Sequence, residues 1–347
     1  MSDEVDLLHH GDRDIAENLV DLAVNVRLSE PPQWLQDVLV ATVGDLATYP
    51  QPEAARAAIA ERHRRPLDQV LPTSGGAEAF TLIARAFAPQ HAVVVHPQFT
   101  EPEAALVAAG HRVDRVILTA AKGFRLAATD IPEPADLVMI GNPTNPTGVL
   151  HRAELLRALT RPGRTLVVDE AFMDSVPGER ESLAAEQIPG LLVLRSLTKT
   201  WGIAGLRAGY VLGEAALISD LAKQQPPWSV STPALAAMVA CSAESAIREA
   251  AAAVPYMQEI RDRLVCGLTD LGYGVVANPQ TPFVVVDTRV AGREPGWMRL
   301  ALREAGFAVR RGESFPGLGP DWIRIAVRDD AVMRSFLAAV EALKVAV

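Results

Sequence analysis

Short runs rich in β-branched residues alternate with longer segments of helical periodicity over the first two thirds of the chain. Segments such as Ala77–Ala88 and Glu101–Ala109 have the helical pattern and separate the strand-like runs. This alternation predicts an α/β fold with a mostly parallel sheet between helices, because parallel strands need a crossover segment between them. The other segments of this pattern are the strand-like runs Ala92–Val95, Leu137–Ile140, Thr165–Val168, Leu191–Leu194 and Tyr210–Leu212, and the helical Arg152–Leu159.

The pattern changes near residue 231. The Ala-rich stretch from Thr232 to Leu271 predicts one or two helices interrupted near Pro255. It is followed by strand-like runs at Phe283–Asp287, Phe307–Arg310 and Trp322–Val327 and by helical patterns at Trp297–Ala305 and Ala331–Lys344. We therefore expect three parts: an N-terminal arm over 1–35 that packs with the small domain, a large domain over 36–230, and a smaller α+β domain over 231–347.

Composition narrows the classes of protein. A chain of 347 residues can form two domains and bury a large core without disulfides. Its two cysteines, Cys241 and Cys266, and the lack of Cys/His pairs at ligand spacing predict neither a disulfide framework nor a metal site. A net charge of −9 without a basic block argues against nucleic-acid binding. Without a signal-like start or an apolar run of about 20 residues, we expect a cytoplasmic protein that makes no membrane contact.

Two glycine-containing turns follow strand-like runs, at the edge where open α/β sheets bind ligands. In Thr73–Glu78, small residues before a helix would let backbone N–H groups approach an anion. The same residues could equally form an ordinary turn with Ser74 as the helix N-cap. Asn142–Gly148, with two Asn-Pro pairs, predicts a rigid turn that fixes the Asn145 amide as a donor to a ligand oxygen.

Two charged segments complete this set. Asp169 ends a buried strand-like run, where a carboxylate without a partner is costly. It could pair with a protonated ring nitrogen, cap a helix or form a structural ion pair. Lys199 is either a solvated loop charge or an amine that bonds a cofactor carbonyl, and the flanking Ser196 and Arg207 could reach a phosphate. An amine, an acid, an amide donor and an anion cradle are the four elements of a pyridoxal-phosphate site.

These segments resemble those of fold-type I pyridoxal-phosphate enzymes of the class I/II aminotransferase family over nearly the whole chain. The resemblance implies that Lys199 bonds the cofactor covalently, that Asp169 faces the pyridine nitrogen, and that Asn145 faces the ring oxygen. It implies Phe99 stacked on the ring, and Phe172 where most transaminases have the Tyr that hydrogen-bonds the ring oxygen. For the cofactor phosphate it implies Gly75, Gly76, Ala77, Ser196 and Arg207. Phe99 could alternatively be a core residue.

The resemblance extends to a subunit partner and to the substrate. Tyr49 is similar to the tyrosine that reaches the phosphate of the neighbouring subunit, which implies a homodimer. Arg324 resembles the C-terminal arginine that grips a substrate anion. Further substrate-binding candidates are His10, Asn25, Arg311 and Arg328. Arg311 and Arg328 could equally be solvated or paired with Glu313 and Asp329. The expected substrate is a small phosphorylated amino acid or amine.

Within the family, the chain is similar to threonine-phosphate decarboxylases of cobalamin synthesis and to histidinol-phosphate aminotransferases. His10-Gly11-Asp12, Asp21–Val26, Phe172 in place of the usual Tyr, and the segment Arg324–Arg328 favour the decarboxylase branch. Departures at Thr281–Phe283 and Arg27-Leu28 lie near the expected substrate. We therefore expect decarboxylation of a phosphorylated amino acid, with transfer of an amino group from histidinol phosphate to 2-oxoglutarate as the alternative.

Two other classes of protein fit the sequence less well. A regulator that senses the cofactor would need a DNA-binding domain, and the chain has neither spare residues nor a basic helix for one. A catalytically inactive scaffold would be expected to lose Lys199 or Asp169, and the chain has both.

Overall fold

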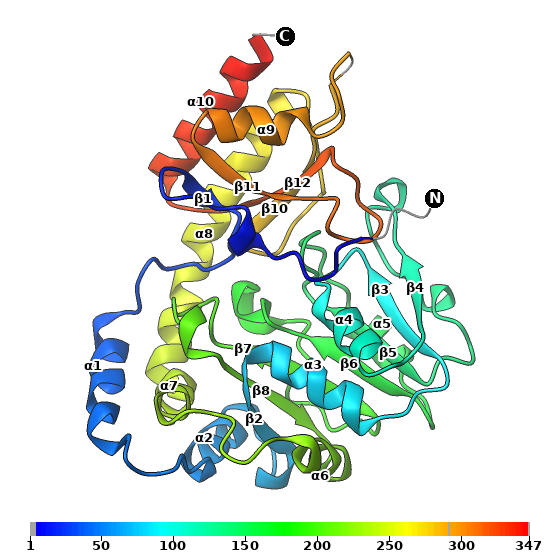
Figure 1. The fold of residues 1–347 in the computed structure, drawn as a ribbon, viewed down its shortest axis with the longest axis vertical. Coiled ribbons are helices and arrows are strands. Elements are labelled where there is room, and N and C mark those ends of the chain that lie inside the picture. Colours follow the sequence, from blue (N-terminus) through cyan, green and yellow to red (C-terminus); the bar gives the residue numbers. More distant parts are fainter. Residues whose placement is uncertain (1–4, 291, 346–347) are drawn as a thin grey trace.

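The computed structural model describes residues 5–290 and 292–345, which form two β-sheets of different size, one above the other in Figure 1. The larger sheet has the strand order β2-β8-β7-β6-β5-β3-β4. Its strands are β2 (Val70–Ser74), β3 (Ala92–His96), β4 (Val113–Ile117), β5 (Leu137–Gly141), β6 (Thr165–Asp169), β7 (Leu191–Ser196) and β8 (Ala208–Gly213). This mixed α/β architecture around a mostly parallel seven-stranded sheet confirms the predicted fold class.

Six of these strands run in one direction. The strands β3 to β7 pair in parallel, whereas β8 is antiparallel to both of its neighbours, β7 and β2. Since β2 is antiparallel to a strand that is itself reversed, its carboxyl end lies at the same edge as those of β5, β6 and β7. The four polar segments identified in the sequence therefore meet at one edge, where open α/β sheets bind ligands.

Helices cover both faces of the larger sheet, and each strand divides its side chains between them because successive residues point to opposite faces. In β6, Leu166 and Val168 belong to one buried cluster and Val167 belongs to the other. The first cluster includes residues of α1 (Gln33–Ala41), α2 (Glu53–His63), α5 (Ala153–Ala158) and α7 (Thr232–Ser242); the second includes residues of α3 (Gly75–Ala86), α4 (Glu101–Ala108) and α6 (Ala215–Gln224).

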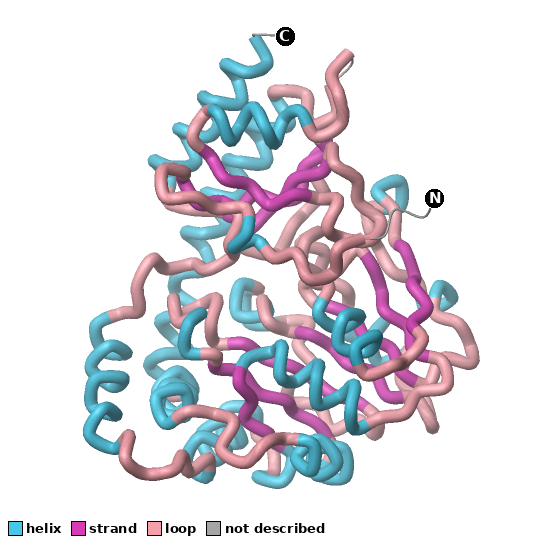
Figure 2. Tube along the Cα trace, viewed as in Figure 1, coloured by secondary structure: helices cyan, strands magenta, loops and turns pink. Residues whose placement is uncertain are grey.

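The smaller sheet, in the order β1-β11-β12-β10-β9, includes a strand from the N-terminal arm. β1 (Val20–Leu22) pairs in parallel with β11, and the other pairs are antiparallel. The sheet consists further of β9 (Gly274–Val275), β10 (Phe283–Asp287), β11 (Phe307–Arg311) and β12 (Trp322–Ala326), with α8 (Glu244–Asp270), α9 (Trp297–Glu304) and α10 (Asp330–Val345) beside it. Figure 2 shows that loops gather between the two sheets.

The Ala-rich stretch after residue 231 forms two helices, but the predicted break near Pro255 is wrong. α7 ends at Ser242, Ala243 has extended backbone angles, and α8 then continues through Pro255 to Asp270. A proline removes one helical hydrogen bond at a cost of about 3 kcal/mol. Burial of the neighbouring Val254 and Met257 along the same helix offsets that cost.

Two expected absences can be examined in the described part of the chain. Within residues 5–290 and 292–345, no helix combines the length and the apolar character needed to cross a membrane. The same residues contain no group of three or more His, Cys, Asp or Glu side chains placed to hold a metal ion. The two cysteines are not bonded to each other; Cys241 is buried and Cys266 is exposed.

Substitutions in β1 test whether the N-terminal arm is part of the core of the smaller sheet. Leu22 is fully buried in the core of the smaller sheet, whereas Val20 on the same strand is 39% exposed. We expect Leu22→Ala to lower the free energy of unfolding by about 2–5 kcal/mol because it opens a cavity. Val20→Ala, the matched control, should cost less than about 1 kcal/mol in chemical denaturation. Equal effects of the two substitutions would show that the arm is not part of this core.

Candidate active site

A cavity of about 460 Å³ lies at the carboxyl edge of the larger sheet. Cavities of roughly 300–1,000 Å³ are typical of small-molecule sites. It brings together twelve of the sixteen predicted site residues: His10, Asn25, Gly76, Ala77, Phe99, Asn145, Asp169, Phe172, Ser196, Lys199, Arg207 and Arg324. The residues come from the arm, both sheets, the start of α3 and the loops after β3, β5, β6 and β7, so the folded topology creates the site.

Lys199 lies in the loop that follows β7, and its amine is buried in the cavity. Burial, together with the positive charges of Arg207 and Arg324, lowers the pKa of Lys199 to about 8. The pKa of a solvated loop lysine would not be lowered by burial in this way. A large fraction of this amine is therefore unprotonated, and nucleophilic, only slightly above neutral pH.

Asp169 is the last residue of β6, and its carboxyl group is buried. One carboxyl oxygen accepts a hydrogen bond from the backbone N–H of Ala171 at 3.0 Å. Burial raises the pKa of Asp169 to about 6, against the opposing effects of this bond and of Lys199. At neutral pH the group is mainly a carboxylate that retains capacity to accept a further charged hydrogen bond.

The start of α3 and the side chain of Arg207 lie together as a candidate anion cradle. Gly75 has φ +76°, and a β-carbon placed on it would lie 2.6 Å from Nη2 of Arg207. Glycine thus allows the guanidinium to lie directly against the backbone at the start of α3. Ser74 is the N-cap residue of α3, as the alternative interpretation of this turn expected, but its side chain makes no cap hydrogen bond. Ser196 and Thr198 complete the cradle, with their hydroxyl oxygens 2.8 Å apart.

Arg324, on β12, also lines the cavity. Its Nη1 donates to Oδ1 of Asn145 at 2.7 Å, and its Nη2 donates to the carbonyl oxygen of Ala23. Its Nε, and both amide atoms of Asn25, are buried and have no hydrogen-bond partner within the described residues. Buried polar groups are almost always paired, so these atoms are available to a ligand in the cavity.

Two arginines predicted to bind substrate do not line the cavity. Arg311 donates to Asp14 at 2.9 Å, and Arg310, its neighbour on β11, lines the cavity instead. Successive strand residues point to opposite faces, and the sequence did not show which face was inward. Arg328 lies beyond the end of β12 at Ala326, and its guanidinium donates to three carbonyl oxygens of the arm, those of Asp21, Val24 and Val26.

Tyr49 also lies away from the cavity of its own chain. Its side chain is 67% exposed and stacks on Trp228 with ring centroids 4.2 Å apart. Phe99 and Phe172 both line the cavity; Phe99 packs beside His10, and Phe172 packs edge-on against Phe283.

The structure adds site residues that the sequence argument did not select. Thr198 and Arg310 line the cavity, as does Gln98, whose amide oxygen accepts from the N–H of Gly141 at 2.7 Å. Thr198 lies in the segment that was recognised around Lys199, so its hydroxyl was a usable signal. Gln98 carries no such signal because a lone glutamine beside a strand is most often a surface residue.

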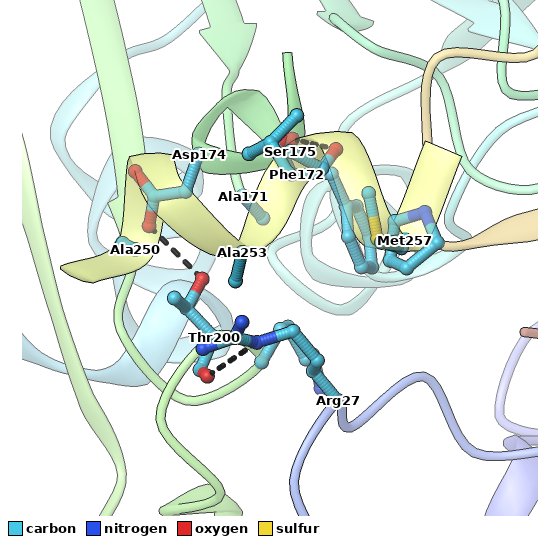
Figure 3. Close-up of a pocket in the computed structure, with 12 residues that line it drawn as sticks. Arg27, Ala171, Phe172, Asp174, Ser175, Thr200, Ala250, Ala253 and Met257 are labelled. Atoms are coloured by element: carbon cyan, nitrogen blue, oxygen red, sulfur yellow. Dashed lines mark hydrogen bonds between the residues drawn. The ribbon is translucent and has the colours of Figure 1, made fainter. Parts of the chain in front are cut away.

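The arm holds the lysine loop in place. The N–H of Arg27 donates to the carbonyl oxygen of Lys199 at 2.9 Å, and its Nε donates to that of Thr200 at 3.1 Å. Arg27 and Thr200 line a second pocket, of about 30 Å³. They lie side by side in Figure 3, where the Thr200 hydroxyl donates to Asp174. The Arg27-Leu28 departure from the family pattern therefore lies against the lysine loop.

These features fit pyridoxal phosphate: a buried amine with a lowered pKa, a buried acid, and a glycine turn that no β-carbon could occupy without displacing Arg207. Fold and site together define a pyridoxal-phosphate enzyme of fold type I. The family model "Aminotransferase class I and II" matches residues 17–340, and the chain belongs to that family.

Two relatives and one solved structure are similar to this chain. A histidinol-phosphate aminotransferase of Mycobacterium tuberculosis is 46% identical, over 93% of this chain and 87% of the relative. A threonine-phosphate decarboxylase of Salmonella typhimurium is 28% identical, over 93% of this chain and 90% of the relative. The crystal structure of the histidinol-phosphate aminotransferase from Clostridium acetobutylicum superposes with a TM-score of 0.85 at 22% identity, covering 95% of this chain and 100% of that one. The last comparison supports the fold alone.

The anion cradle can be tested by adding one methyl group. We expect Gly75→Ala to raise the dissociation constant of pyridoxal phosphate for the apoprotein at least about tenfold, because it displaces a charge-assisted contact. Gly205→Ala is the matched control, since a β-carbon there has open space and Gly205 lies two residues from Arg207. The constants can be measured by fluorescence titration. Equal affinity of the two variants would exclude this cradle as the phosphate site.

Proposed function

We propose that Lys199 bonds pyridoxal phosphate covalently through Nζ, with Asp169 facing the ring nitrogen and Asn145 facing the ring oxygen. The support is their convergence on one cavity together with the buried state of both charged groups. The residues proposed to hold the phosphate and the ring are Gly75, Gly76, Ala77, Ser196, Thr198, Arg207, Phe99 and Phe172.

The cofactor, when bound, withdraws electrons from the carbon that carries the substrate amine. Lys199 Nζ, with its pKa of about 8, is suited to take up and return a proton at that carbon at mildly alkaline pH. The Asp169 carboxylate would keep the ring nitrogen protonated, because an opposite charge at hydrogen-bond range favours the charged form. The buried aromatic rings of Phe172 and Phe283 exclude water from that side of the cavity.

The state of Arg324 supports a substrate with an anionic group. Its guanidinium is buried, and among the described residues it forms no ion pair with a carboxylate within 4.0 Å. Burial, and then the nearby Arg310, lower the pKa of Arg324 well below its usual value. A buried cation without a counter-ion is costly, and a ligand phosphate or carboxylate would remove that cost. Arg310 adds a second positive charge, partly offset by Asp14 at 3.4 Å.

We further propose that the enzyme transfers an amino group from histidinol phosphate, or a close phosphorylated amine, to 2-oxoglutarate. The 46% identity to a histidinol-phosphate aminotransferase over 93% of the chain carries this proposal. Amino transfer, which was the alternative in the sequence analysis, is therefore preferred to decarboxylation. Decarboxylation of a phosphorylated amino acid stays the second candidate, supported by Phe172 and by the 28% identity to a threonine-phosphate decarboxylase.

A homodimer is part of the proposal. Exposed apolar side chains lie at the end of α1 and in the segment that follows it: Val40, Val43, Leu46 and Tyr49. Exposed Trp228 stacks on Tyr49. Exposed apolar groups of this kind are typical of protein interfaces. We propose that a second copy covers them and that Tyr49 then reaches the cofactor phosphate of the neighbouring subunit.

The substrate proposal is tested by following both reactions in parallel. Holoenzyme is mixed with histidinol phosphate plus 2-oxoglutarate, and separately with O-phosphothreonine, while glutamate and carbon dioxide are measured. We expect glutamate formation from histidinol phosphate, with Arg324→Gln lowering kcat/KM about 10–100-fold through loss of a charge-assisted contact. Arg311→Gln, outside the cavity, is the control and should change it little. Carbon dioxide release from O-phosphothreonine without any glutamate would instead establish the decarboxylase.

A further inference from the structure

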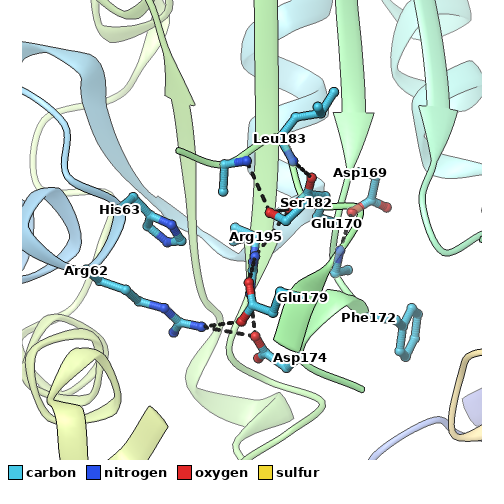
Figure 4. Close-up of polar contacts among 12 residues, drawn as sticks. Arg62, His63, Asp169, Glu170, Phe172, Asp174, Glu179, Ser182, Leu183 and Arg195 are labelled. Atoms are coloured by element: carbon cyan, nitrogen blue, oxygen red, sulfur yellow. Dashed lines mark hydrogen bonds and ion pairs between the residues drawn. The ribbon is translucent and has the colours of Figure 1, made fainter. Parts of the chain in front are cut away.

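Asp169 and Ser196, the last residues of β6 and β7, each have a charged neighbour in the sequence. Glu170 follows Asp169, and Arg195 precedes Ser196 on β7. Because successive residues of extended chain point in opposite directions, Asp169 and Ser196 line the cavity while Glu170 and Arg195 point away from it. Figure 4 shows these two buried side chains meeting behind the site.

Arg195 is the centre of a buried ion network. Its Nη1 lies 2.6 Å from Oε2 of Glu179 and 3.2 Å from Oε2 of Glu170, and its Nη2 contacts Oδ1 of Asp174. Arg62 of α2 bridges Asp174 at 3.1 Å and Glu179 at 3.2 Å (Figure 4). Burial opposes the charge of Arg195, but attraction to Glu179 and Asp174 outweighs it and raises the pKa of Arg195 above its already high value, so the group is a permanent cation.

The ion network around Arg195 also contacts the segments that carry Asp169 and Lys199. Glu170 is the residue next to Asp169. Burial raises the pKa of its carboxyl group to about 7, and this group also accepts from the N–H of Leu183 at 2.6 Å. Asp174 accepts the hydroxyl of Thr200, the residue next to Lys199, at 3.0 Å. A single guanidinium therefore links the neighbours of Asp169 and of Lys199 through one carboxylate on each side.

We infer that Arg195 is a positioning residue that sets the separation and orientation of Lys199 and Asp169 in the cofactor site. The planar guanidinium presents several donors in fixed directions, so it can hold Glu170, Asp174 and Glu179 in one arrangement. Buried ion pairs often add little to stability compared with apolar replacements, whereas they can specify geometry. This inference rests on the roles proposed for Lys199 and Asp169 but is independent of the choice of substrate.

Three substitutions separate positioning from stability. Arg195→Met removes the charge at similar length, and Arg195→Lys keeps the charge but loses the planar arrangement of donors. Thr200→Val cuts only the bond to the lysine loop and leaves every buried ion in place. Arg157→Met is the matched control, because Arg157 forms an exposed pair with Glu186 far from the cavity lining. Melting temperature, cofactor dissociation constant, kcat, KM and the pH titration of the cofactor absorption band are measured for each.

We expect Arg195→Met and Thr200→Val to lower kcat at least about tenfold with KM within about twofold, since misplacing a reacting group by about 1 Å can cost 100-fold. Both should shift the pH titration of the absorption band, while Arg157→Met leaves it unchanged. Arg195→Lys should restore the melting temperature more fully than kcat. The opposite result, variants that lose melting temperature but keep the wild-type titration and kcat, would make the network purely structural.

The experiment also distinguishes failure of this inference from failure of the proposed site. Wild-type protein without a cofactor absorption band that depends on Lys199 would refute the proposed site itself. A normal band in the wild type, with the same titration and kcat in Arg195→Met and Thr200→Val, would refute only the positioning role of Arg195.

Discussion

Burial of charge at the carboxyl edge of the larger sheet is the constraint on which the site depends. Lys199, Asp169 and Arg324 are all placed in a region from which water is largely removed, and each has a pKa displaced from its usual value by that burial. Such groups are tolerated when a ligand supplies the missing partners. A cofactor with a cationic ring nitrogen, an aldehyde and a phosphate, together with an anionic substrate, would supply them.

The alternation of strand side chains lets one sheet edge serve two purposes. One set of residues at the ends of β6 and β7 lines the cavity, and the adjacent set forms the ion network around Arg195. The arm adds a third layer by binding the lysine loop through Arg27 and by contributing β1 to the smaller sheet. The segments that carry Asp169 and Lys199 are thus held by the ion network around Arg195, and the lysine loop is also held by hydrogen bonds from Arg27 of the arm.

The sequence was most informative where a local pattern carries the chemistry. Strand periodicity predicted the larger sheet, and the motif residues that follow its strands converge as expected. Orientation near strand ends was the main source of error. Arg311 was chosen as a substrate-binding residue, but its neighbour Arg310 lines the cavity, and Arg328, in the segment after β12, donates to the arm. The network around Arg195 depends on long-range contacts between α2, β6, β7 and the loop after β6. Local sequence patterns do not predict such contacts.

The central claim is that Lys199 is the residue that bonds the cofactor, and peptide mapping after borohydride reduction tests it most directly. Purified protein saturated with pyridoxal phosphate is reduced, digested and analysed by mass spectrometry. We expect the cofactor mass on the peptide that contains Lys199, and no fixation in Lys199→Ala, with exposed Lys223 unmodified in both. Cofactor fixed on another lysine, with Lys199→Ala modified as efficiently as the wild type, would contradict the account.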